Sequence, residues 1–158
     1  MSDQTHERVF LVVVDDSEEW RAALLFASRR ARKTGGRVAL LTIIEPSDFQ
    51  HWMAVEAVMR AELRQEAEER LSAAAAEVRT NTGRWPVLHI RDGNRAEQVL
   101  ALIEEEPSIS ILVLGSSEAQ EGPGPIISHL MDRSFGRLRV PVTIVPGHLS
   151  ADQIHLIA

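Results

Sequence analysis

Five short apolar runs divide the chain and predict buried β-strands. The run at 9–14 reads VFLVVV and the run at 109–114 reads ISILVL. Such nearly continuous apolar stretches are typical of strands that are covered on both faces in a parallel sheet. The other three runs lie at 38–44, 86–90 and 140–145, so the sequence predicts five strands.

Segments with apolar residues at helical spacing separate these strands. The first follows Asp15, Asp16 and Ser17, whose short polar side chains are suited to cap a helix. A long helix follows the second strand, a third begins after Asn94 as its cap, and a fourth is expected over 126–137. The apolar stripe expected on the long helix consists of Val55, Met59, Leu63, Ala67, Leu71, Ala74 and Val78.

This alternation predicts an α/β fold: a five-stranded parallel sheet with helices on both faces. The expected strand order is 3-2-1-4-5. Ligands of such sheets bind beyond the carboxyl ends of the strands, where the order reverses, which here falls between strands 1 and 4. The 158 residues are expected to form one domain, with a core at 8–146 and a short tail at 147–158.

Composition and charge argue against several classes of function. A net charge of −6 disfavours binding to nucleic acid, which needs a basic face. The chain has no cysteine, and no apolar stretch approaches the ~20 residues that span a bilayer. The polar segment at 1–8 has no signal-peptide core, so a cytoplasmic protein without membrane contact is expected.

Four stretches resemble the universal stress protein family: VVVDDSEEW after the first strand, LLTIIEP at the second, LGSS after the fourth and VPVTIVP at the last. The resemblance implies a Rossmann-like fold of the adenine nucleotide alpha hydrolase type. In nucleotide-binding members, an acidic residue after strand 1 contacts the nucleoside, and a G-x2-G-x9-G-[ST] motif after strand 4 holds the phosphates. By this resemblance, Asp15 would hold a nucleoside and Ile43 would line an adenine pocket.

The phosphate motif is degraded in this chain. Aligned from Gly115, its four positions read Gly115, Glu118, Ser128 and His129. Glu118 would repel a triphosphate. Ser128 adds a Cβ atom where binding would call for close backbone approach or for a conformation that only glycine adopts cheaply. We therefore expect weak or absent ATP binding and no cofactor, with an ATP-binding member as an alternative. The candidate ligand-binding residues are Asp15, Ile43, Gly115, Ser116, Ser117, Ser128 and His129.

Catalytic and metal chemistry find little support in the sequence. Ser116 and Ser117 have no identifiable base partner, and neither His51 nor His89 has a second ligand at metal-binding spacing. We therefore expect no enzymatic activity and no metal site; a slow nucleotide hydrolase is a weaker alternative. Another alternative is a two-component receiver that uses Asp15, Asp16 and Asp92, although the lysine that a receiver needs after strand 5 is absent.

The last strand is expected at an edge of the sheet, with apolar Val140, Val142, Ile144 and Val145 along it. An exposed apolar edge can pair with a second chain, and the family resemblance implies a homodimer through this strand. The alternative is that the tail covers the edge. Together these expectations describe a dimeric binding or regulatory protein in the stress response, with an unidentified small ligand or protein partner.

Overall fold

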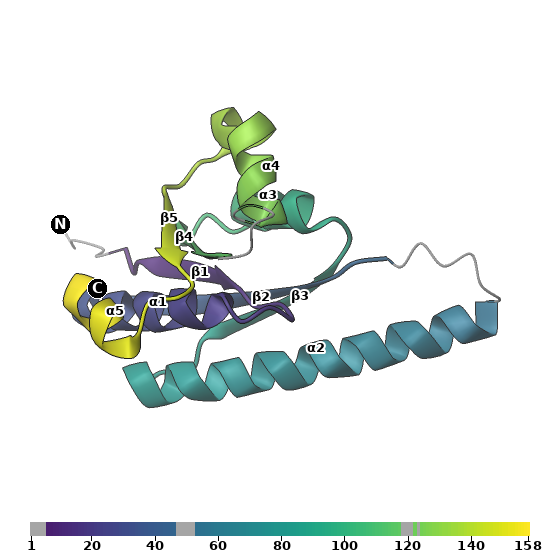
Figure 1. Ribbon diagram of the computed structural model, residues 1–158, viewed down its shortest axis with the longest axis horizontal. Helices are drawn as coiled ribbons and strands as arrows, with labels where there is room; N and C mark the ends of the chain where they lie inside the picture. The colour runs from purple at the N-terminus through teal and green to yellow at the C-terminus, as the bar shows by residue number, and fades with distance from the viewer. Residues whose placement is uncertain (1–5, 47–52, 118–121, 123) are drawn as a thin grey trace.

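The computed structural model describes residues 6–46, 53–117, 122 and 124–158, and its centre is one parallel sheet (Figure 1). The strand order is β3-β2-β1-β4-β5, which confirms the predicted order. The strands are β1 (Val9–Val13), β2 (Arg37–Ile44), β3 (Val87–Asp92), β4 (Ile109–Ser116) and β5 (Val142–Pro146).

Helices cover both faces of the sheet, as predicted (Figure 1). One face carries α1 (Trp20–Thr34), α2 (Met53–Thr82) and α5 (Ala151–Ile157), and the other carries α3 (Arg95–Glu105) and α4 (Pro125–His129). The central strand β1 is buried along its whole length. Its Phe10 and Val12 pack in the α1 layer, whereas Val9, Leu11 and Val13 pack in the α3 layer. Burial on both faces explains why this strand is apolar without interruption.

The last strand begins two residues later than the sequence predicted, so the assignment of Val140 to it is wrong. Val140 is 8% exposed and packs in the α3 layer with Ile109 and Leu130. Pro141 follows; its carbonyl accepts a hydrogen bond of 3.0 Å from the Leu112 amide, but proline has no N–H to donate to the ladder. Regular pairing of β5 with β4 therefore starts at Val142.

The predicted helix over 126–137 is helical but not one regular α-helix. The α-helix α4 covers Pro125–His129, a π-helical turn follows at Leu130–Ser134, and a 3-10 turn at Phe135–Arg137. Ile126, Ile127 and Leu130 are buried on the sheet side. Gly136, a poor helix former, lies in the final turn. The buried side chains hold the segment against the sheet, although its backbone hydrogen bonds change from the α-helical to the π-helical and then to the 3-10 pattern.

The segment after β5 ends in a helix that the sequence analysis did not predict. Its cap is reciprocal: the Ser150 hydroxyl accepts from the Gln153 amide at 3.2 Å, and the Ser150 amide donates to the Gln153 side chain at 2.9 Å. Ile154 and Ala158 are buried in the α1 layer. The helix α5 packs against α1, and Ile144 on β5 is 44% exposed.

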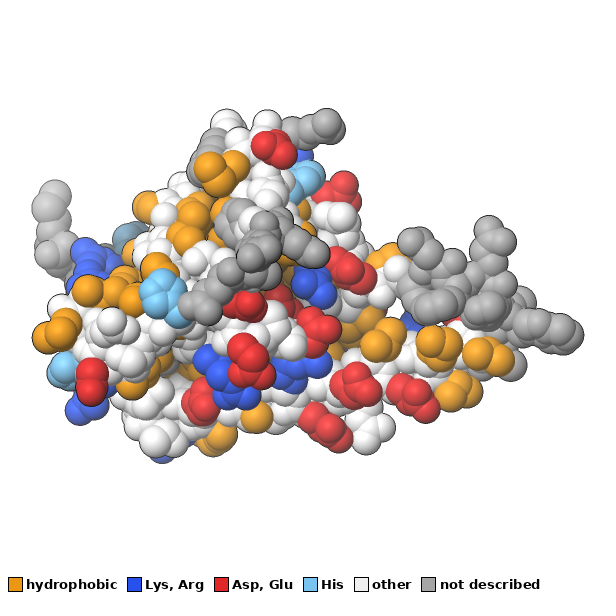
Figure 2. Space-filling model, in the orientation of Figure 1, with side chains coloured by type: hydrophobic (Ala, Val, Ile, Leu, Met, Phe, Trp, Pro, Cys, Tyr) orange, Lys and Arg blue, Asp and Glu red, His pale blue; other side chains and the backbone are white. Residues whose placement is uncertain are grey.

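The helix α2 is longer than the sheet that it covers. Its 30 residues span ~45 Å at 1.5 Å per residue, whereas the eight residues of β2 span ~26 Å. The predicted stripe is accordingly buried only in its second part, at Ala67, Leu71, Ala74 and Val78. The first turns extend beyond the strands and expose Val55, Val58 and Leu63 (Figures 1 and 2). Within the described ranges, no helix combines the length and the apolar character needed to cross a membrane.

Candidate functional site

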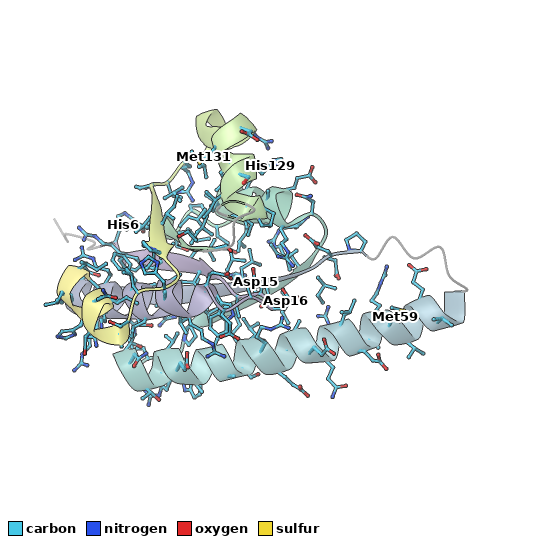
Figure 3. The ribbon with its side chains drawn as sticks, viewed as in Figure 1. His6, Asp15, Asp16, Met59, His129 and Met131 are labelled. Atoms are coloured by element: carbon cyan, nitrogen blue, oxygen red, sulfur yellow. The ribbon has the colours of Figure 1, made fainter. Side chains whose placement is uncertain are left out.

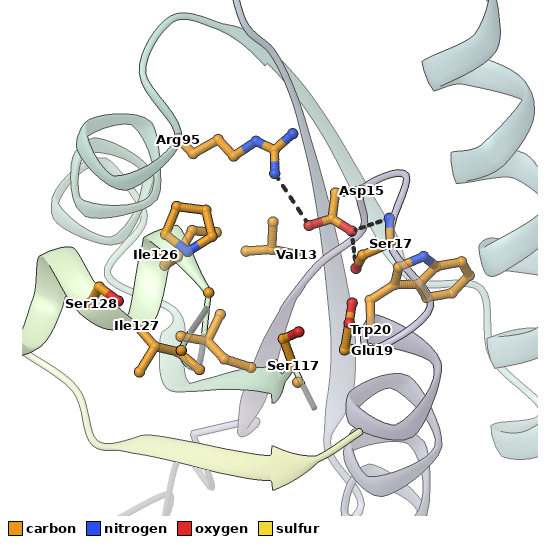
Figure 4. Close-up of a pocket in the computed structure, with 15 residues that line it drawn as sticks. Val13, Asp15, Ser17, Glu19, Trp20, Arg95, Ser117, Ile126, Ile127 and Ser128 are labelled. Atoms are coloured by element: carbon orange, nitrogen blue, oxygen red, sulfur yellow. Dashed lines mark hydrogen bonds and ion pairs between the residues drawn. The ribbon is translucent and has the colours of Figure 1, made fainter. Parts of the chain in front are cut away.

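A cavity of about 460 Å³ opens at the carboxyl ends of β1 and β4 (Figure 4). This is the point at which the strand order reverses, where ligands of open α/β sheets bind. Its floor includes Val13 of β1 and Leu114 of β4, and α4 supplies Ile126 and Ile127. Polar side chains also line the cavity: Asp15, Ser17, Glu19 and Arg95.

Asp15 is held at the rim by the strand that precedes it. The Val14 amide donates to the Leu41 carbonyl at 2.8 Å, and the buried Thr42 hydroxyl donates to the Val14 carbonyl at 3.0 Å. The chain then leaves the sheet, and the Asp15 carboxylate accepts from the Ser17 amide at 2.8 Å and from the Ser17 hydroxyl. Asp15 thus stabilises the turn after β1.

The prediction that this segment caps the first helix is therefore wrong. Glu19 is the N-cap residue of α1, and it makes no side-chain capping bond. Asp15, Asp16 and Ser17 come too early to reach the free amides of the first turn. The helix starts later than expected because the turn held by Asp15 occupies the residues in between.

Arg95 connects the loops that follow two neighbouring strands. Its guanidinium lies 3.5 Å from Asp15 and 3.7 Å from Asp16, after β1, and 3.1 Å from Glu45, after β2. Arg95 is the first residue of α3, whose cap Asn94 accepts from the Glu97 amide at 3.1 Å. Among the described residues that line the cavity, Arg95 is the only basic one, and three carboxylates already surround it.

Gly115 makes possible a close contact between β4 and the start of α1. A Cβ atom placed on Gly115 would lie 2.1 Å from the Glu19 carbonyl oxygen. Gly147, after β5, is equally constrained, since its Cβ atom would lie 2.6 Å from the Ser116 carbonyl and 2.9 Å from Glu19 Cγ. The Glu19 residue is therefore enclosed between the ends of β4 and β5.

The Glu19 carboxylate faces the cavity beside Ser117 (Figure 4). The neighbouring Ser17 side chain, the Glu19 amide and the Ser117 side chain lower the pKa of this carboxylate, against the opposing effect of burial. Donors of this kind stabilise the charged form of a carboxylate. The site therefore holds a fixed negative charge beside the loop after β4.

The predicted ligand-binding residues divide into two groups. Asp15, Gly115, Ser117 and Ser128 line the cavity. Ile43, Ser116 and His129 are not among the residues that line it: Ile43 packs against the α3 layer, Ser116 accepts a bond from the Gly147 amide through its carbonyl, and Figure 3 shows His129 on α4, apart from Asp15. Glu118 lies outside the described residues.

Arg95 and Glu19 are the site residues that sequence reasoning missed. Arg95 had one indication, because it starts the helix after strand 3 and so lies at the carboxyl edge of the sheet. Glu19 stood in the acidic run with Asp15, Asp16 and Glu18, where nothing distinguishes one carboxylate from another. The turn after β1 places Asp15 beside Arg95 and Glu19 at the N-cap of α1, and the sequence does not show where this turn ends.

The side chains present suit binding better than catalysis. The described lining residues include no histidine, lysine or cysteine, and among the residues that the structure describes no three His, Asp or Glu side chains gather as metal ligands. Asp92, which a receiver would need beside Asp15, lines a different hollow with Arg60 and Gly93.

Known proteins share this architecture. Residues 7–146 match the Universal stress protein family. Universal stress protein UspA from Lactobacillus plantarum superposes with a TM-score of 0.74 at 19% identity, over 89% of this chain and 97% of that one. A universal stress protein family member from Burkholderia pseudomallei gives 0.69 at 19% identity, over 90% and 98%. A universal stress protein from Archaeoglobus fulgidus in complex with dAMP gives 0.60 at 19% identity, over 88% and 97%.

The fold and the cavity define an α/β protein of the Rossmann-like class, with its pocket at the reversal of strand order. The family match spans all five strands, so the chain belongs to the universal stress protein family. Membership of this family argues against the alternative of a two-component receiver. A search of curated proteins found none that matches the sequence.

Proposed function

We propose that this chain is a single-domain, homodimeric universal stress protein that binds a small ligand or a protein partner, catalyses no reaction, and binds ATP weakly or not at all. Family membership and the cavity between β1 and β4 support a binding function. The relative from Archaeoglobus fulgidus in complex with dAMP makes a nucleotide the first ligand to test. Asp15, Gly115, Ser117 and Ser128 are the proposed contact residues.

One observation carries the expectation of weak ATP binding: the glycine that remains from the phosphate motif is used for packing. Gly115 is required by the Glu19 backbone, which approaches to within 2.1 Å of the position of a Cβ atom. Its presence is therefore explained without a phosphate. The serine at position 128 supplies a side chain where nucleotide-binding members have glycine.

Isothermal titration with ATP and magnesium tests this proposal. We expect a dissociation constant above ~100 µM, which corresponds to less than ~5.5 kcal/mol of binding free energy. A micromolar constant, lost in Asp15→Asn and Ser117→Ala, would show instead that the chain is an ATP-binding member. Adenosine, titrated in parallel, separates recognition of the nucleoside from recognition of the phosphates.

The proposed dimer forms through β5. Among the described strands it pairs with β4 alone, on one side, and it carries the exposed side chain of Ile144. Val142 and Thr143 are half-buried, and Val145 is buried in the α1 layer. The helix α5 packs on α1. An edge strand with an exposed isoleucine suits addition of a second copy.

Light scattering after size exclusion tests the dimer. We expect the unmodified protein to run as a dimer and Ile144→Lys to shift it toward the monomer. Leu156→Lys is the control, because Leu156 is 84% exposed on α5 and the substitution adds the same charge. A monomeric parent protein, or equal behaviour of the two variants, would contradict assembly through β5.

A further inference from the structure

The end of the cavity beside Ser117 has the donors of an anion-binding site. The side chains of Ser17 and Ser117 and the Glu19 amide meet at one point, and the N-terminus of the 15-residue helix α1 lies there as well. Hydroxyls, free amides and a helix N-terminus together favour a negative charge. The group that already occupies this point is the protein's own Glu19 carboxylate.

Glu19 cannot easily leave this position. Its carbonyl is in contact with Gly115, and its Cβ and Cγ atoms lie against Gly147, at 3.1 and 2.9 Å from the position that a Cβ atom would take there. The stem of the side chain is therefore held between the ends of β4 and β5. The carboxylate at its end points into the cavity that a ligand would enter (Figure 4).

The charges around the cavity do not compensate for Glu19. Arg95 is the only basic residue among the described lining residues, and it is already placed between Asp15, Asp16 and Glu45. An incoming phosphate would thus meet a fixed carboxylate and would find the neighbouring hydroxyls already engaged. Two negative charges a few ångströms apart repel each other even through water.

We propose that Glu19 is a specificity-determining residue: its carboxylate fills the anion position of the cavity, so that the pocket selects ligands without a negative charge at that end. The inference rests on the proposed function, because it assumes that the cavity is the ligand site. It adds that the ligand is uncharged or cationic next to Ser117, as a nucleoside is and a nucleotide is not. It also names the single charge that sets this preference.

The test compares two variants that remove one negative charge each. Glu19→Gln keeps the length of the side chain, and Glu18→Gln makes the same change one residue earlier, on a side chain that is 85% exposed and pairs with Arg21 at 2.9 Å. The affinities of ATP, pyrophosphate and adenosine are measured for both variants and the parent protein by titration, followed through the amide resonances of Gly115 and Ser117. Thermal melting checks that each variant is folded, and Glu19→Met, which keeps the unbranched stem, repeats the test.

We expect Glu19→Gln to bind ATP and pyrophosphate at least about fivefold more tightly than Glu18→Gln does, with adenosine unchanged. The difference should shrink at ~0.5 M salt because the repulsion is screened. Equal affinities in the two variants, no anion binding by Glu19→Gln, or a parallel gain for adenosine would each overturn the proposal. Micromolar ATP binding by the parent protein would contradict the proposed function instead, whatever the ratio between the variants.

Discussion

The carbonyl oxygen of Glu19 lies 2.1 Å from the point where a Cβ atom of residue 115 would be, so that only glycine fits at the end of β4. Both partners are backbone atoms, Gly115 in β4 and Glu19 at the N-cap of α1, so neither can move aside cheaply. We predict that Gly115→Ala lowers the free energy of unfolding by ~3 kcal/mol, as overpacking of a tight core does. Urea unfolding followed by circular dichroism measures this.

Gly136→Ala is the matched control for that substitution. A Cβ atom at Gly136 would meet nothing within 4 Å, so the change should alter stability by less than ~0.5 kcal/mol. Similar losses in both variants would mean that the contact between Gly115 and Glu19 relaxes at no cost.

Arg95 should contribute to stability through the carboxylates that it separates. Arg95→Gln leaves Asp15, Asp16 and Glu45 without the guanidinium between them, and we expect a loss of ~1 kcal/mol at low salt, since all four groups are partly exposed. Salt screens the repulsion between the remaining carboxylates, so the difference in free energy of unfolding between the variant and the parent protein should be smaller at ~0.5 M salt. Arg60→Gln, which breaks one exposed pair with Glu56, should cost less than ~0.5 kcal/mol. A difference in free energy of unfolding that does not depend on salt would contradict this electrostatic explanation.

Arg139 joins the end of α3 to the start of β4 through backbone carbonyls. Its guanidinium donates to Ile103 at 2.7 Å, Glu106 at 3.1 Å and Ile109 at 3.2 Å. Lysine cannot reproduce these bonds because its donors spread from one atom, so Arg139→Lys should lower the free energy of unfolding by ~1.5 kcal/mol. Arg137→Lys, at an exposed residue 3.8 Å from Glu104, should have almost no effect in the same denaturation experiment.

His89 should make the stability fall in mildly acidic solution. Burial lowers its pKa below the ordinary value of 6.5, with Glu106 opposing the shift and Arg91 reinforcing it. The folded protein therefore binds the proton less readily than the unfolded chain, and the free energy of unfolding decreases as the pH falls through 6.5 towards the folded value. Thermal melts at about pH 7.5 and about pH 5 measure this loss.

His89→Gln removes the titrating group, so its melting temperature should fall less over the same pH interval than that of the parent protein. His6→Gln, at an exposed residue before β1, is the control and should retain the parent's pH dependence. An unchanged loss in His89→Gln would assign the acid sensitivity to other groups.

The topology was predictable because a central strand that is buried on both faces needs an apolar residue at nearly every position. The apolar runs of β1 and β4 fixed the positions of the strands, and alternation with helices fixed their direction. The ends of elements were less certain: Val140 is apolar because it is buried, but the proline that follows it delays the strand. The last helix has seven residues, too few for a periodic pattern, although its Ser150 and Gln153 form a recognisable capping box.

The site was predictable in its place and only partly in its residues. Strand order alone located the cavity, and Asp15 and Gly115 followed from their positions after strands 1 and 4. Arg95 reaches this place from the first turn of α3, which follows a strand at the far edge of the sheet, and no spacing along the chain reveals such a contact. Glu19 acquires its role from the close packing of Gly115 and Gly147, which exists only in the folded protein.

The first turns of α2 have a consequence for local unfolding. They extend beyond the strands, expose Val55, Val58 and Leu63, and carry exposed pairs such as Arg60 with Glu56 and Arg64 with Glu68. Unwinding them uncovers the ends of β2 and β3 at Ile44 and Asp92, which line a hollow with Arg60, and leaves the central strands covered. Their amide hydrogens should therefore exchange with solvent through local fraying. The turns around Leu71 and Val78 should exchange only when the whole protein opens, so a single helix would contain both fast-exchanging and slow-exchanging amides.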